Sequence, residues 1–97
     1  MSDPGFEKLC SVLPQELANF ARIAHEALPV APISATLSLY SSPRVEVRHN
    51  GHVLHVRGVS WEPMHWGLHS PDRGWLVGMH AGDPLDGLAS LGVEVER

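Results

Sequence analysis

Residues 44–58 read Arg-Val-Glu-Val-Arg-His-Asn-Gly-His-Val-Leu-His-Val-Arg-Gly, and this stretch decides the fold. Asn50-Gly51 separates two runs in which apolar and polar residues alternate. Asparagine and glycine tolerate the positive φ that the type I′ turn of a two-residue hairpin requires. The turn sets the register of a β-hairpin, because each strand must start directly beside it. The predicted pairs are His49–His52, Arg48–Val53, Val47–Leu54, Glu46–His55, Val45–Val56 and Arg44–Arg57.

The two faces of this hairpin differ in polarity, because successive side chains of a strand point to opposite sides of the sheet. The face expected to be buried carries four aliphatic side chains, Val45, Val47, Leu54 and Val56. The face expected to be solvated carries Arg44, Glu46, Arg48, Val53, His55 and Arg57. The hairpin therefore predicts a sheet with one face in the core and one face in water.

Two helices are predicted before the hairpin. Asp3-Pro4 favours a helix start, because aspartate caps free N–H groups and proline suits the first helical position. Apolar residues then recur at helical spacing, at Phe6, Leu9, Cys10 and Leu13. After Pro14, the range Gln15–Leu28 repeats this pattern, with one face formed by Leu17, Phe20, Ala21, Ala24 and Leu28.

A strand is predicted over Ile33–Tyr40, where apolar and polar residues alternate strictly. A second hairpin is predicted from Met64–His69 and Trp75–His80 around the four-residue turn Pro71–Gly74. Its expected core face consists of Met64, Trp66, Leu68, Trp75, Val77 and Met79. Its other face is expected to pair His69 with Leu76, Gly67 with Gly78 and His65 with His80.

The C-terminal part predicts a short helix and a last strand. Asp83-Pro84 repeats the helix-start pair, Gly92 is a helix stop, and Val93 and Val95 suit a strand. We therefore expect one α+β domain over residues 1–97. Its N-terminal helices pack on a mostly antiparallel meander sheet of four or five strands, in the order ααββββαβ.

Composition restricts the class of protein. The apolar fraction of 43% and the charged fraction of 19% are typical of a globular domain. The net charge of −4 disfavours nucleic acid and anionic membranes as partners. One cysteine excludes an intramolecular disulfide, and neither a secretory signal nor a membrane-length apolar stretch is seen. We expect a cytoplasmic protein, and the heavy use of alanine, glycine, proline and arginine suggests a bacterial or phage source.

Seven histidines raise the question of a metal site. His49 with His52, and His65 with His80, are each expected to face one another across two strands. Zinc needs three or four ligands, and no complete zinc motif is present. A homodimer would need only two ligands from each chain, so the alternative hypothesis is a homodimeric domain that binds a metal such as zinc, or a small ligand, through paired histidines. For His55, the nearby Glu46 and arginines act in opposite directions, so the direction of its pKa shift is left open.

The polar hairpin face carries Arg44, Arg48 and Arg57, the main basic surface of the chain. Glu46 lies among them and no aromatic side chain is expected beside them for base stacking, which favours an acidic protein over nucleic acid. Trp61 does not fall on a predicted core face. Tryptophan and arginine are enriched where proteins bind one another. Together with His55, these residues are the expected partner-binding set.

Catalytic patterns are not evident in the sequence. Cys10 lies within an apolar helical stripe, where cysteine behaves as a small hydrophobic residue. Neither the serine-nucleophile elbow nor a glycine-rich phosphate loop occurs. The leading hypothesis is a non-enzymatic protein-interaction module, of an accessory or inhibitor type, that binds its partner through a sheet face or edge.

Overall fold

The computed structural model describes residues 4–58 and 62–95. In them, five antiparallel strands follow the meander order β1-β2-β3-β4-β5, with helices before and after. The predicted α+β class is confirmed. The elements are α1 (Pro4–Ser11), α2 (Gln15–Ala27), β1 (Ile33–Thr36), β2 (Arg44–His49), β3 (His52–Arg57), β4 (His65–Ser70), β5 (Gly74–Ala81) and α3 (Pro84–Ser90).

The first hairpin has the predicted register. All six pairs between β2 and β3 match, from His49–His52 at the turn to Arg44–Arg57 at the open end. Asn50 has φ +49° and Gly51 has φ +75°. These are the left-handed values that a type I′ turn needs. The turn chemistry of two residues thus determines which side chains of two strands face the core.

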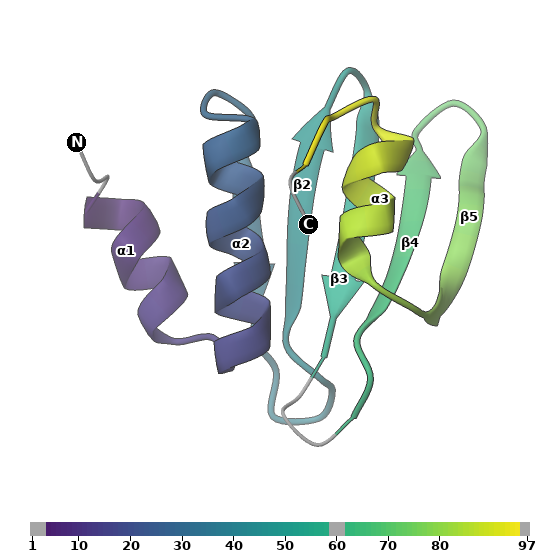
Figure 1. The fold of residues 1–97 in the computed structure, drawn as a ribbon. Helices are drawn as coiled ribbons and strands as arrows, with labels where there is room; N and C mark the ends of the chain where they lie inside the picture. Colours follow the sequence, from purple (N-terminus) through teal and green to yellow (C-terminus); the bar gives the residue numbers. More distant parts are fainter. Residues whose placement is uncertain (1–3, 59–61, 96–97) are drawn as a thin grey trace.

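The molecule has two layers, with α2 and α3 on the same side of the sheet (Figure 1). The core lies between the layers, and the four aliphatic side chains predicted for the first hairpin are fully buried there. Leu17, Phe20 and Ala24 of α2 and Leu88 of α3 complete it from the helical side. We call the opposite side of the sheet, which carries Arg44, Arg48 and His55, the outer face. The helices of the described chain all lie away from this face.

Strand β1 is shorter than the sequence predicts. It ends at Thr36, which pairs with Arg44, so the chain must reverse direction over residues 37–43. No residue of β2 is left to pair with Leu37–Tyr40. The predicted strand over Ile33–Tyr40 is therefore too long, and two leucines on the apolar side of its alternation are exposed, Leu37 to 53% and Leu39 to 96%.

The predicted register of the second hairpin is also wrong. Ser70 pairs with Gly74, which leaves a three-residue loop in place of the expected four. His69 therefore pairs with Trp75, which lies on the outer face and is 49% exposed. Two irregularities in β5 then bring Val77 opposite Leu68 and His80 opposite Trp66. His65 pairs with Ala81, so the two histidines of this hairpin do not face each other.

Helix α3 begins and ends as predicted. The Leu85 N–H donates to the Asp83 carboxylate at 2.9 Å. At the other end, the N–H groups of Gly92 and Val93 donate to the carbonyls of Ala89 and Leu88, which is a Schellman motif. The strand expected at Val93–Val95 is not formed. This segment lies against α2 and packs its valines on the core.

None of the helices within residues 4–58 and 62–95 combines the length and apolar character needed to cross a bilayer.

Candidate functional site

Three strands bring a cluster of rings together on the outer face. His55 of β3, His69 of β4 and Trp75 of β5 form this ring cluster. The centroid of the Trp75 ring lies 5.0 Å from that of His55 and 5.1 Å from that of His69, and the two imidazoles are 6.1 Å apart. The indole is therefore held by both imidazoles while about half of it stays in contact with solvent.

Gly67 leaves room beside the ring cluster. It pairs with His55, so a side chain at this position would project from the outer face. The sulfur of Met79 fills this space, since a Cβ added to Gly67 would lie 2.9 Å from the Met79 Sδ. Met79, predicted for the core face, therefore lies on the outer face. The cluster is bordered by a flexible, polarisable side chain.

Arginines surround the ring cluster on the β2 and β3 side. Arg48 Nη2 lies 3.3 Å from the Glu46 Oε2, and Arg48 Nη1 donates to the Ser34 hydroxyl at 3.3 Å. Ser34 pairs with Glu46 on the neighbouring strand, so these contacts join three positions of the outer face. Because Arg48 is exposed, its ion pair is screened by solvent and contributes little to stability. The pair does position the guanidinium over the face.

His55 is a titratable residue of the outer face that packs against the rings of His69 and Trp75. Its side chain is half-buried, and its Nδ1 is shielded from solvent without a hydrogen-bond partner among the described residues. Burial lowers the pKa of His55 below the ordinary 6.5; Glu46 opposes this shift, and Arg44, His69 and Arg48 add to it. The sequence leaves the direction of this pKa shift open, and in the structure the desolvation of the imidazole determines it. His55 is neutral at physiological pH.

The lowered pKa of His55 gives a pH-dependent stability. Below pH 6.5 the unfolded chain binds a proton at this residue more readily than the folded chain does. Its contribution to the free energy of unfolding is therefore present above pH 6.5 and is lost as the pH falls through the lowered pKa. We expect denaturant titrations to show a smaller acid-induced loss of stability in His55→Phe than in the wild type. An NMR titration midpoint of His55 at or above 6.5 would contradict this prediction.

Of the two histidine pairs predicted to face one another and bind a metal, the structure brings only one pair face to face. His49 and His52 are cross-strand partners, as predicted. Both are engaged with Asn50: the Nε2 of His49 lies 3.2 Å from the Asn50 amide nitrogen, and the His52 Nδ1 donates to the Asn50 carbonyl at 3.0 Å. His65 and His80 are not opposite one another. Within the described parts of the chain, no three histidine, cysteine or acidic side chains come together for one metal ion. Zinc binding remains a prediction that would require ligands from a second chain.

Trp61 and Cys10 are the two other residues that the sequence singled out as candidates for function. Trp61, the expected exposed anchor, lies outside the described residues. Cys10 is buried in the core, as its position in an apolar stripe predicts. Burial raises the pKa of its thiol, with Arg22 opposing and Glu7 adding to the shift. A buried thiol with a raised pKa is a poor nucleophile.

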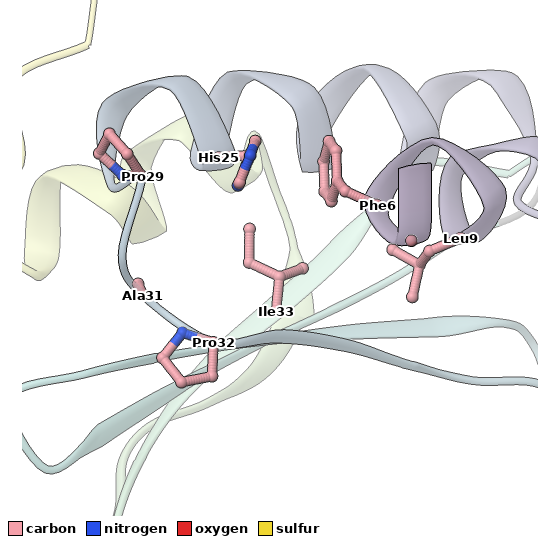
Figure 2. Close-up of a pocket in the computed structure, with 8 residues that line it drawn as sticks. Phe6, Leu9, His25, Pro29, Ala31, Pro32 and Ile33 are labelled. Carbon is pink, nitrogen blue, oxygen red and sulfur yellow. The ribbon is translucent and has the colours of Figure 1, made fainter. Parts of the chain in front are cut away.

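A pocket of about 310 Å³ lies between α1, α2 and the start of β1. Figure 2 shows His25 of α2 and Ile33 of β1 pointing toward one another across it, with Phe6 of α1 beside them. The Phe6 and His25 rings are stacked with their centroids 4.2 Å apart. The remaining lining residues are Gly5, Leu9, Pro29, Ala31 and Pro32. The side chains that line it are apolar except for His25, while polar atoms make up the larger part of its accessible surface.

Sequence reasoning missed His69 and Trp75 as partners of His55. The signal that could have found them is the length of the turn after Ser70. The three-residue loop is followed directly by Gly74, whose φ of +74° is left-handed, and a left-handed glycine is a common feature of short hairpin connections. With that loop, Trp75 faces His69 and both lie on the side of His55.

The fold and the outer face together define a small α+β domain with one sheet face that its helices leave open. Comparisons of the chain with protein-family models, with curated proteins and with solved structures found no match.

Proposed function

We propose that the chain is a non-enzymatic protein-interaction module that binds an acidic segment of another protein on its outer face. The observation that carries this proposal is the ring cluster in the open face of the sheet, bordered by Arg44, Arg48 and Arg57. A ring centre with a charged border is the usual composition of a protein-binding patch. Tryptophan and arginine are also the side chains that most often dominate such patches energetically.

The charge of this face supports an acidic partner. On β2 and β3 it carries three arginines and one glutamate, and Glu46 is already paired with Arg48. The whole chain has a net charge of −4, whereas these three arginines lie together on the side of the sheet that lacks a helical cover. A local basic patch on an acidic molecule attracts an acidic segment and disfavours a basic one.

The arrangement of the rings supports binding by a preformed surface. Trp75 is held between two imidazoles in the unbound chain. Ordering a side chain on binding costs about 0.5–1.5 kcal/mol, and a side chain that is already held loses less. Neutral His55 adds an apolar surface rather than a second positive charge. We expect Trp75 to be the anchor and Arg48 to select acidic residues around it.

The test is a selection of random peptides displayed on phage against the immobilised wild-type protein. We expect the enriched peptides to combine aspartate or glutamate with an apolar residue. Their dissociation constants should rise at least tenfold, about 1.4 kcal/mol, in Trp75→Ala and in Arg48→Glu. Peptides that bind these variants as tightly as the wild type, or a selection without enrichment, would refute the proposal.

Two matched variants control for non-specific effects. Arg22→Glu makes the same charge change on an exposed position of α2, in the other layer. Val12→Ala shortens an exposed apolar side chain next to α1. Both should leave peptide affinity unchanged. The nominated anchor Trp61 can be assayed in the same way with Trp61→Ala.

A further inference from the structure

Strand β1 is an edge of the sheet with no protection against pairing. Within the described chain only β2 pairs with it. Exposed edges usually carry charged residues or prolines that prevent association with another strand. From Ile33 to Ser42 the sequence contains neither a charged residue nor a proline. The edge is therefore chemically neutral and open.

The segment after β1 has the pattern of a strand but lacks a partner. Alternation continues through Leu37 and Leu39 to Tyr40, yet residues 37–40 are unpaired. Leu39 is 96% exposed and Tyr40 is 95% exposed. An aliphatic side chain of this size contributes roughly 1.5–3 kcal/mol when it is transferred from water into a core. The alternating pattern thus predicts a half-buried strand that is longer than the part of it that pairs with β2.

The order of residues in this segment is complementary to itself. When two copies of residues 33–39 run antiparallel about a two-fold axis at Thr36, apolar residues face apolar residues and hydroxyl residues face hydroxyl residues. An interface of this kind places the same residues on both subunits. The resulting pairs are Ile33–Leu39, Ser34–Ser38, Ala35–Leu37 and Thr36–Thr36.

The backbone of β1 is oriented for the same register. The Arg48 N–H donates to the Pro32 carbonyl at 3.1 Å, so alternate residues from Pro32 onward bond inward to β2. The N–H and C=O groups of Ile33 and Ala35 therefore point away from β2, toward the open edge. In the two-fold register residues 37–39, which lie outside β1 in the single chain, extend in line with this strand. Ile33 and Ala35 then form hydrogen-bonded pairs with Leu39 and Leu37 of the second copy.

We propose that the chain forms a homodimer by pairing the Ile33–Leu39 edges of two copies, and that Leu39 of one copy enters the pocket of the other. Leu39 would face Ile33, which lines the pocket below Phe6 and Leu9 of α1. In Figure 1, α1 lies beyond α2 on the side away from β2, where the added strand would run. The partner's leucine would thus contact the apolar side chains of Phe6, Leu9 and Ile33, which are only partly buried in one chain. This inference does not depend on the proposed binding of acidic peptides.

The test is the mass of the protein in solution, measured by light scattering and sedimentation over micromolar concentrations. We expect a dimer in the wild type and a dissociation constant at least tenfold higher in Leu39→Lys. Because Leu39 is exposed in one chain, this variant should keep the thermal stability of the monomer. Tyr40→Lys makes the same change at an equally exposed neighbour outside the register, and should leave the dimer intact.

A cross-link tests the register itself. The residue on the two-fold axis belongs to a non-hydrogen-bonded pair with Cα atoms about 4.5 Å apart, which a disulfide can span. Thr36→Cys should therefore form a covalent dimer on mild oxidation, whereas Ser38→Cys, which faces Ser34, should do so far less. A monomeric wild type, a dimer that Leu39→Lys leaves unchanged, or a dimer that a chelator dissociates would overturn the proposal.

Discussion

Gly67→Ala is expected to destabilise the protein by about 1–3 kcal/mol, the usual cost of overpacking a well-packed site. A Cβ at this position would lie 2.9 Å from the Val77 carbonyl oxygen and 3.0 Å from the Met79 nitrogen. Both are backbone atoms of β5, so the strand must move to relieve the contact. Movement of β5 would also displace Trp75 from His55 and His69.

Gly78→Ala provides the matched control in the same pair of strands. A Cβ there meets nothing within 4 Å, and Gly78 does not have a positive φ. Alanine in a strand is favoured over glycine by roughly 0.5–1 kcal/mol. Urea denaturation of the two variants should therefore give changes of opposite sign. Equal destabilisation by both would show that the contact between β4 and β5 is not as close as described.

Leu54→Ala is expected to cost about 2–5 kcal/mol, because it removes a fully buried side chain and leaves a cavity. Leu54 lies on β3 beneath α3. Small domains are stable by only about 5–15 kcal/mol in total, so this variant should lose a large part of its stability. Leu76→Ala, at an exposed position of β5, is the control and should change the free energy of unfolding little.

The cavity left by Leu54→Ala should reverse the effect of a second substitution, Gly87→Ala, on the free energy of unfolding. A Cβ added to Gly87 of α3 would lie 2.5 Å from the Leu54 Cδ1 and 3.0 Å from the Trp66 ring. Gly87→Ala should therefore destabilise the wild type. In the Leu54→Ala background the added methyl enters the vacated space, and the substitution should be neutral or stabilising. A double-mutant cycle measures this coupling, and additive effects would contradict it.

The first hairpin could be predicted completely because its information is local. Asn50-Gly51 selects one turn type, and that turn determines the register of every pair in β2 and β3. The positions of Arg44, Arg48 and His55 on one face follow directly. The pKa of His55 could not be predicted, because its dominant cause is burial by rings from β4 and β5.

The second hairpin could not be predicted because several turns fit its sequence. A loop shorter by one residue moves Trp75 from the core face to the outer face. Alternation also gave no sign of the irregularities that return Val77 to the core. The ring cluster was therefore missed, although each of its members is visible in the sequence.

Strand β1 shows a different limit of pattern analysis. Alternation in Ile33–Tyr40 reports which side chains would suit burial, and it carries no information about where a pairing strand comes from. The chain supplies one only as far as Thr36. Residues 37–39 continue the alternation beyond this point, and the proposed homodimer would supply the strand that pairs with them.

The meander order has a consequence for how the chain folds during synthesis. Each strand pairs with its neighbour in sequence, so the sheet can grow hairpin by hairpin as the chain leaves the ribosome, with short loop closures that cost little entropy. Helix α3 comes after all five strands and packs on β3 and β4. The apolar surface around Leu54 and Trp66 therefore stays uncovered until α3 has left the ribosome. During that interval the nascent chain presents an apolar sheet face to chaperones and to other nascent chains.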